Sequence, residues 1–143
     1  MQTGAKTASF DYAVLRVVPR VERQEFVNVG VIVFCLERRL LKAKVHVNEA
    51  RLLALWPGLD VETVKQHVQA VVRICEGDET AGAIARLSQR ERFHWLISPR
   101  STMIQTSPVH TGICAEGEDV VGRLFAQMVS SESETASGAK APS

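Results

Sequence analysis

The segment Asn28-Val-Gly-Val-Ile-Val-Phe-Cys-Leu36 decides the fold class, because it is apolar on both sides of an extended chain. Side chains alternate between the two faces of a sheet along a strand. Strict alternation places one set on each face: Asn28, Gly30, Ile32 and Phe34, against Val29, Val31, Val33 and Cys35. This pattern predicts a central strand that is covered on one face and partly on the other. Gly30 indicates either a β-bulge or a close approach by a ligand or a backbone.

Two further strands flank the central one. Residues 10–18 are rich in aromatic and β-branched side chains, and Pro19 ends this run. Residues 40–47 follow a polar break and alternate apolar residues with Lys42 and Lys44, which predicts a half-exposed strand hairpinned to the central one. Lysines at a sheet edge disfavour edge-to-edge association between copies of the chain.

Helical periodicity begins after residue 47. Asn48 can cap a short helix, and Asp60 can cap a longer one whose apolar stripe ends before Gly77. A weaker helix is expected from Asp78 through the polar run at 89–92, and an amphipathic helix over residues 116–129. The predicted fold is α+β. Its antiparallel sheet has strands at about residues 10–18, 28–36 and 40–47, with one or two more in 102–114, and four helices pack mainly on one face.

The composition is that of one ordinary globular domain. The chain has 143 residues, of which 45% are hydrophobic and 23% charged. Residues 9–130 are expected to form a single domain, between a flexible N-terminus at 1–8 and a disordered tail at 131–143. A net charge of +1 argues against a nucleic-acid partner. No apolar run approaches the roughly 20 residues of a membrane span, so a cytoplasmic location without a membrane partner is expected.

The sequence lacks the motifs of the common cofactor and metal sites. No P-loop, dinucleotide-binding glycine motif, zincin motif or serine nucleophile elbow is present, so no cofactor is expected. The three cysteines, Cys35, Cys75 and Cys114, lie far apart without a CxxC pair. We therefore expect them to be reduced thiols in the core, with no metal site.

Residues 93–112 carry an unusual density of side chains that can bind an anion or move a proton. Aromatic residues precede Ser98-Pro-Arg-Ser-Thr102, and a second turn is expected at Ser107-Pro-Val-His-Thr-Gly112. Arginine beside hydroxyl groups is suited to phosphate or carboxylate recognition. The alternative for Arg100 is a surface ion pair with Glu22 or Glu25, and for His110 it is a hydrogen bond within the turn. His67 falls off the apolar stripe and is not expected to bind a ligand.

Two long motifs resemble a known family. The segment from Tyr12 to Phe34, and the segments Phe93–Thr102 and Ser107–Gly112, are similar to those of a bacterial family of domains of unknown function, number 3037. The resemblance spans about residues 10 to 130, and its pattern centres on Pro19–Gly30 and Pro99–Ser101. It implies no established activity. Members are often encoded beside a protein similar to HipA-like kinases, which implies a partner role.

These observations predict one site at an end of the sheet, shared by two segments distant in sequence. Its candidate ligand-binding residues are Arg16, Arg20, Glu22, Glu25, Asn28, Arg100, Ser101, Gln105, Ser107 and His110. Two positions remain open for the Arg16 side chain: it either points into a cleft or lies in solvent at the end of the strand. For the charged crossing at 20–25, a solvated connection is the alternative.

Two functional hypotheses follow. The first is a binding or accessory module with an arginine-lined anion pocket, partner to a HipA-like kinase. The second is a small enzyme acting on a phosphorylated or nucleotide substrate, with His110 as acid or base and Arg100 as anion clamp. A nucleic-acid-binding protein ranks third because the charge is nearly neutral.

Overall fold

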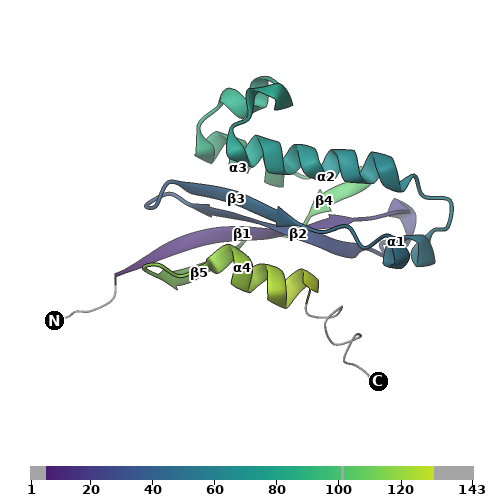
Figure 1. Ribbon diagram of the computed structural model, residues 1–143, viewed down its shortest axis with the longest axis horizontal. Helices are drawn as coiled ribbons and strands as arrows, with labels where there is room; N and C mark the ends of the chain where they lie inside the picture. Colours follow the sequence, from purple (N-terminus) through teal and green to yellow (C-terminus); the bar gives the residue numbers. More distant parts are fainter. Residues whose placement is uncertain (1–5, 101, 131–143) are drawn as a thin grey trace.

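The computed structural model describes residues 6–100 and 102–130, and these form an antiparallel sheet with helices on both faces (Figure 1). The strands are β1 (Thr7–Val17), β2 (Val27–Cys35), β3 (Leu40–Val45), β4 (Ile104–Thr106) and β5 (His110–Ala115). The order across the sheet is β3-β2-β1-β4, and β5 also pairs with β1. The α+β prediction is confirmed, and β2 is an interior strand as its sequence indicated.

The ends of the predicted domain fall partly outside the described residues. The flexible N-terminus was expected at 1–8, but β1 already begins at Thr7, and residues 1–5 are not described. The predicted disordered tail, residues 131–143, also lies outside the described part of the chain. Among the residues described, no helix has both the length and the apolarity needed to cross a membrane.

The outer neighbour of β1 is built from two short strands. β4 pairs with Leu15–Val17 and β5 pairs with Thr7–Tyr12, both antiparallel. Between them, the Ser107 amide donates to the Val14 carbonyl at 2.8 Å, and the Ser107 hydroxyl accepts from the Val14 amide at 2.8 Å. The side chain thus replaces a backbone acceptor where the strand is interrupted. Ser107 is buried and has a structural role in the sheet.

The helices begin and end with recognisable caps. They are α1 (Glu49–Leu55), α2 (Val61–Glu76), α3 (Gln89–Ile97) and α4 (Val120–Phe125), with a π-helical turn at Ala126–Ser130. Asn48 and Asp60 accept the expected N-terminal backbone bonds, and Gly77 ends α2 with a φ of 74°. Ser88 forms a capping box with Glu91 at the start of α3.

The third predicted helix is misplaced. Residues 79–81 and 83–86 form two short 3₁₀ turns, and Gly82, with a φ of 104°, separates them. The α-helix starts only at Gln89 and continues through Ile97. The aromatic residues that precede Ser98 therefore lie on α3. Glycine in a left-handed conformation interrupts helix propagation, which accounts for the shift.

The two faces of the sheet bury separate cores. α2 and α3 lie over one face and α4 lies under the other (Figure 1). The first core joins Ile32 and Phe34 to Leu52, Val64, Val68 and Phe93; the second joins Phe10, Val31 and Val33 to Val121, Leu124 and Phe125. All three cysteines are buried and free, as predicted, and burial raises the pKa of the Cys75 thiol to about 12.

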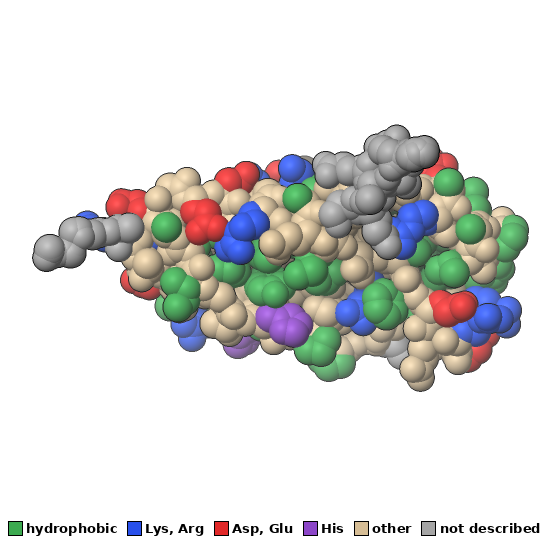
Figure 2. All heavy atoms as spheres, turned by 90° about the horizontal axis from the view of Figure 1, so that it is seen from below, with side chains coloured by type: hydrophobic (Ala, Val, Ile, Leu, Met, Phe, Trp, Pro, Cys, Tyr) green, Lys and Arg blue, Asp and Glu red, His purple; other side chains and the backbone are tan. Residues whose placement is uncertain are grey.

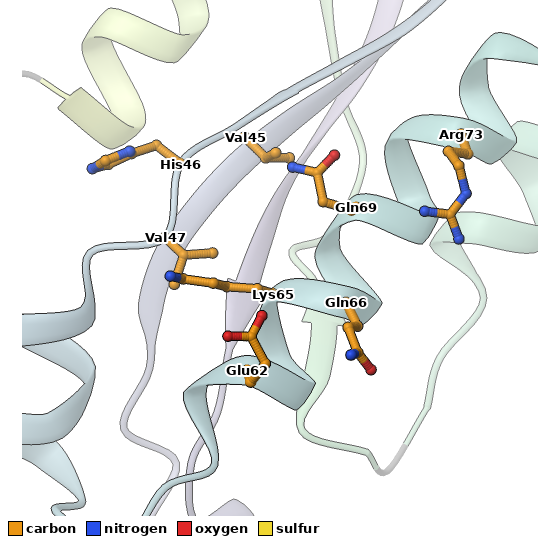
Figure 3. Close-up of a pocket in the computed structure, with 8 residues that line it drawn as sticks. All are labelled: Val45, His46, Val47, Glu62, Lys65, Gln66, Gln69 and Arg73. Carbon is orange, nitrogen blue, oxygen red and sulfur yellow. The ribbon is translucent and has the colours of Figure 1, made fainter.

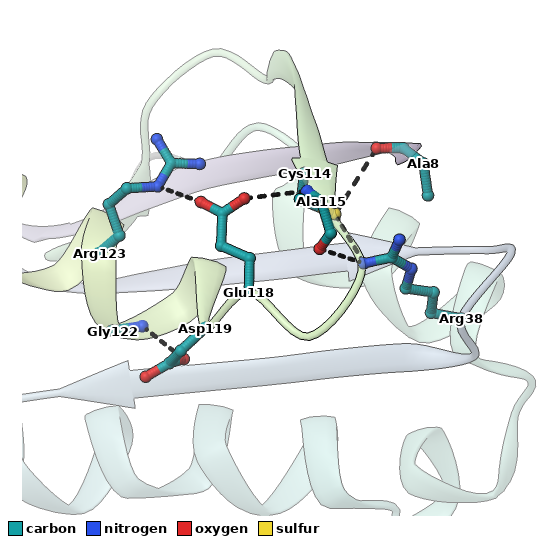
Figure 4. Close-up of polar contacts among 8 residues, drawn as sticks. All are labelled: Ala8, Arg38, Cys114, Ala115, Glu118, Asp119, Gly122 and Arg123. Atoms are coloured by element: carbon teal, nitrogen blue, oxygen red, sulfur yellow. Dashed lines mark hydrogen bonds and ion pairs between the residues drawn. The ribbon is translucent and has the colours of Figure 1, made fainter. Parts of the chain in front are cut away.

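A network of polar contacts holds the turn between β5 and α4 (Figure 4). Arg38 donates to the Ala115 carbonyl at 2.9 Å and to the Cys114 sulfur at 3.3 Å. Glu118 accepts from the Ala115 amide at 3.0 Å and pairs with Arg123 at 2.7 Å. These contacts attach α4 to the end of the sheet, so the helix is held in place by more than its apolar face.

Strict alternation in β2 fails at one residue. Leu15 is paired with Gly30, but Arg16 is paired with Asn28, so Val29 is an extra residue in a β-bulge. Val29 consequently packs with Ile32 and Phe34 under α2, and not with Val31. The prediction that Asn28 and Gly30 share a face is wrong for this reason. The bulge turns Asn28 toward the α4 side of the sheet, where its amide reaches the Met128 carbonyl.

Gly30 is required by the close approach of β3. A Cβ atom on Gly30 would lie 2.7 Å from both the Lys44 carbonyl oxygen and the Val45 Cγ1. We expect Gly30→Val to lower the free energy of unfolding by about 2 kcal/mol, because backbone atoms must move to admit the side chain. Urea denaturation measures this loss, with Lys42→Ala on the exposed face of β3 as the control. An unchanged denaturation midpoint for Gly30→Val would show that the hairpin is looser than the structure indicates.

Candidate functional site

Three polar residues form a row across the sheet. Arg16 on β1 is paired with Asn28 on β2 and with Gln105 on β4. Residues directly opposite one another in an antiparallel sheet point to the same face. The row therefore lies on the α4 side, beyond the end of that helix. The bulge in β2 is what brings Asn28 into it.

Arg16 is partly buried without an ionic partner. Its guanidinium lies 4.0 Å from the centre of the Phe26 ring, and its Nε is buried without a hydrogen bond. Among the described residues no carboxylate forms an ion pair with it. Burial lowers the pKa of Arg16 because desolvation disfavours the charged form. The charge is thus stabilised by an aromatic face but not by an opposite charge.

Asn28 ties the C-terminal turn to the sheet. Its side-chain amide donates to the Met128 carbonyl at 3.1 Å, while its Oδ1 is buried without a partner. The unpaired acceptor of Asn28 and the unpaired donor of Arg16 belong to side chains that face each other across β1 and β2. Two buried polar atoms without a hydrogen-bond partner therefore lie on neighbouring residues of this row.

A pocket of about 430 Å³ opens beside Arg16. We call it the Arg16 pocket; its walls are Arg16, Val18, Val21, Gln24, Phe26, Arg100 and Gln105. Val21 and Gln24 come from the crossing between β1 and β2, whereas Arg100 and Gln105 come from the segment after α3. Two segments that are distant in sequence thus form one pocket. The polar groups alternate with the apolar walls of Val18, Val21 and Phe26.

The charged residues of the β1–β2 crossing pair with one another. A 3₁₀ turn spans Val21–Arg23. Arg20 pairs with Glu22 at 3.0 Å, and Arg23 pairs with Glu25 at 2.9 Å, all at the surface. Exposed pairs of this kind contribute little stability. Arg20, Glu22 and Glu25 do not line the Arg16 pocket, in agreement with the alternative of a solvated connection.

Arg100 lies at the C-terminus of α3. Its guanidinium donates to the Trp95 carbonyl and, at 3.4 Å, to the Leu96 carbonyl, and it stacks on the Trp95 ring at 4.2 Å. A cation there satisfies carbonyl groups that lack intrahelical donors. Glu22 and Glu25 pair elsewhere, so the predicted alternative of an Arg100 ion pair with them is not observed. Arg100 brings a fixed positive charge to the pocket wall.

The remaining predicted site residues lie outside the Arg16 pocket, although Ser107 lines a neighbouring pocket of about 290 Å³ with Arg100 and Gln105. His110 is exposed on β5, opposite Tyr12, with its ring 5.4 Å from the tyrosine ring. Ser107 completes the sheet beside Val14. Neither lines the Arg16 pocket. Ser101 lies outside the described residues.

Four wall residues were not predicted from the sequence. Val18, Val21, Gln24 and Phe26 line the pocket, although only charged and hydrogen-bonding residues were singled out in advance. Phe26 could have been selected from the sequence, because it is an aromatic residue just outside a predicted strand. In the structure its side chain remains 43% exposed. Exposed aromatic residues beside arginine commonly mark binding surfaces.

The comparisons with known proteins identify the family. A family model described as "Protein of unknown function (DUF3037)" matches residues 12–129. No curated protein and no solved structure gives a significant match to the sequence. The match covers both motifs noted in the sequence and every described wall residue of the Arg16 pocket. The chain therefore belongs to the DUF3037 family of proteins of unknown function.

Proposed function

We propose that the protein is a binding module that holds a carboxylate or phosphate group in the Arg16 pocket. The main support for this proposal is the environment of Arg16. Its side chain is partly buried, packs against the Phe26 ring and forms no ion pair among the described residues. A charge that is partly removed from water is stabilised when an opposite charge is placed beside it. A bound anion supplies that charge.

The walls of the pocket support an anionic ligand with an apolar part. Arg100 adds a second positive charge, and Gln24 and Gln105 add side-chain amides. A planar guanidinium binds carboxylate and phosphate oxygens through paired N–H groups. Val18, Val21 and Phe26 offer apolar contact to the remainder of the molecule. The volume of about 430 Å³ suits a small molecule or one side chain of a partner.

The lining favours binding over catalysis. Among its described residues there is no histidine, cysteine, serine or carboxylate that could act as a nucleophile or general acid. The enzyme alternative needs His110, which lies opposite Tyr12 on β5. Acidic and basic side chains are interspersed on the face seen from the α4 side (Figure 2), which does not favour nucleic acid.

Titration with simple anions tests the proposal. We expect inorganic phosphate or citrate to bind the wild type, and Arg16→Gln to weaken binding by about 10- to 100-fold, since a charge-assisted contact contributes about 1.5–3 kcal/mol. We expect Arg100→Gln to weaken binding less, because two N–H groups of Arg100 already donate to carbonyl groups at the end of α3. Isothermal titration calorimetry at low and high salt measures both effects. Arg90→Gln, on the exposed side of α3, is the matched control and leaves binding unchanged.

Two outcomes contradict the anion pocket. One is the absence of binding by phosphate, citrate and acetate at millimolar concentration. The other is binding that Arg16→Gln and Arg90→Gln leave equally intact, which would place the anion elsewhere on the surface.

An accessory role beside a HipA-like kinase is the biological setting that we propose for this module, on the strength of the family resemblance. Co-purification of the two proteins at micromolar concentration tests it. If the kinase supplies the anionic group, Arg16→Gln weakens the association and Arg90→Gln does not.

A further inference from the structure

A groove lies between α2 and the end of β3 (Figure 3). Its volume is about 720 Å³. We call it the α2–β3 groove; it is lined by Val45, His46 and Val47 on one side and by Glu62, Lys65, Gln66, Gln69 and Arg73 on the other. It shares no residue with the Arg16 pocket, so its role is independent of the proposed anion site.

One wall of the groove is the free edge of a sheet. β3 is the terminal strand in the order β3-β2-β1-β4, so one of its sides has no strand partner among residues 6–100 and 102–130. The His46 amide donates to the Val29 carbonyl at 2.7 Å, toward β2. Backbone groups of successive residues in a strand point to opposite sides. Those of Ala43 and Val45 in β3 therefore point outward, away from β2.

The close contact at Gly30 supports the same orientation. Gly30 is paired with Val45, and a Cβ atom on Gly30 would lie only 3.2 Å from the Val45 Cα. Opposing residues approach this closely in the pairs that do not exchange hydrogen bonds. The N–H and C=O groups of Val45 are thus available to a strand added from outside.

The other wall is a polar stripe along α2. Glu62, Lys65, Gln66, Gln69 and Arg73 are three or four residues apart in turn or adjacent, so they occupy one side of the helix. Lys65 pairs with Glu49. The side-chain amides of Gln66 and Gln69 have no hydrogen-bond partner among the described residues, and neither Arg73 nor Glu62 forms an ion pair there. Figure 3 shows Gln69 directed toward Val45 and Lys65 toward Val47.

We propose that an extended polypeptide segment of a partner protein binds in the α2–β3 groove by adding a strand to the outer edge of β3. Its backbone bonds to Ala43 and Val45, and its alternate side chains face α2. Grooves between an edge strand and a helix bind peptides by this mode, with backbone bonds giving affinity and side chains giving specificity. The unpaired amides of Gln66 and Gln69 suit polar side chains.

The charges along α2 specify the peptide further. Arg73 brings a positive charge to one end of the groove, and Glu62 brings a carboxylate to the other end, beside Lys65, whose charge is paired with Glu49. The two residues are separated by about 16 Å along a helix with a rise of about 1.5 Å per residue. A strand advances about 3.3 Å per residue, and only every second side chain faces the helix. The peptide therefore carries an acidic and a basic residue four or six positions apart.

A second copy of the chain fits the edge poorly. In a two-fold antiparallel pair of β3 strands centred on Lys42, Ala43 or Lys44, lysines of one copy would face lysines of the other, and in a pair centred on Val45 Lys44 would face His46. Like charges directly opposite in a sheet are destabilising. The occupant is thus a heterologous peptide, and self-association is an outcome that the experiment must exclude.

Selection from a displayed library of random eight-residue peptides tests the proposal. We expect enrichment of sequences with an acidic and a basic residue four or six positions apart. On binding, a selected synthetic peptide slows hydrogen exchange of the Val45 amide. Arg73→Glu weakens binding about tenfold, as expected for loss of a charged contact. Methylation of the peptide nitrogen that bonds to Val45 abolishes binding, whereas Arg16→Gln has no effect.

Two proline variants separate strand addition from folding. Val45→Pro folds, because its N–H points away from β2, but it no longer binds the peptide. Lys44→Pro loses a bond to β2 and is destabilised. If Val45→Pro fails to fold, two measurements still test the proposal: hydrogen exchange of the Val45 amide in the wild type and peptide binding by Arg73→Glu. The proposal is overturned if no charged pattern is enriched, if bound peptides leave the Val45 amide unprotected, or if Val45→Pro dissolves a dimer of the free protein.

Discussion

Replacement of Phe93 by alanine is expected to lower the free energy of unfolding by about 3–5 kcal/mol, the range for removing a fully buried aromatic side chain. Phe93 is 2% exposed and stacks on Phe34 with 5.3 Å between ring centres. It is the main apolar contact between α3 and the sheet, because this helix has few other buried side chains: Arg92 and Leu96. Urea denaturation followed by circular dichroism measures the loss.

The effect of Phe93→Ala extends to the Arg16 pocket. Arg100 reaches the pocket wall from the C-terminus of α3, where it binds the Trp95 and Leu96 carbonyls. A loosened α3 moves this charge, so anion affinity falls together with stability. For stability, Trp95→Ala is the control on the same helix, since Trp95 is 40% exposed, and it costs less than Phe93→Ala. It is not a control for anion affinity, because Arg100 stacks on the Trp95 ring. Equal losses for the two variants would show that Phe93 does not anchor α3.

Arg92→Met is expected to cost about 3 kcal/mol, because it leaves buried carbonyl groups without donors. Arg92 is 9% exposed. Its Nη1 donates to the Ile74 carbonyl at 2.7 Å and to the Cys75 carbonyl at 2.8 Å, and its Nε donates to the Leu87 carbonyl at 3.0 Å. From the next helix, the Arg92 side chain thus supplies hydrogen-bond donors to the last carbonyl groups of α2 and places a positive charge at the C-terminus of α2.

Two further variants show which property of Arg92 matters. Arg92→Lys keeps the charge but loses the planar fork of donors, so it recovers only part of the stability. Arg90→Met removes an exposed arginine from the same helix and changes the unfolding free energy by less than about 0.5 kcal/mol. Thermal denaturation compares the four proteins. If Arg92→Met and Arg90→Met behave alike, the contacts to α2 do not contribute to stability.

Much of the fold could be predicted because its signals are local. The apolar content of β2 predicted an interior strand, and the alternation at Lys42 and Lys44 predicted an edge strand. Asn48, Asp60 and Gly77 marked helix ends through contacts within a few residues of the chain. The errors arose where local signals compete. Gly82 divides the 78–92 segment, and the capping box at Ser88 starts α3 later than the apolar pattern suggested.

The candidate site was predictable only in part. Arg16, Asn28, Arg100 and Gln105 were selected because their side chains can bind an anion, and they lie at or beside one pocket. Ser107 and His110 have the same chemical capacity, but one completes the sheet and the other lies on β5. Hydrogen-bonding capacity is a property of the residue, whereas proximity depends on strand register. The α2–β3 groove was missed because the position of α2 beside the edge strand depends on tertiary packing.

The amino-acid sequence was sufficient to predict the first three strands, the interior position of β2 and both ends of α2. Periodicity and capping act within a few residues, so they can be recognised without tertiary contacts. Three features became evident from tertiary contacts alone: the bulge at Val29, the burial of Arg92 against α2 and the meeting of residues 16–26 with 100–105. Each depends on which segments pack together, because register and long-range contacts set the position of a side chain.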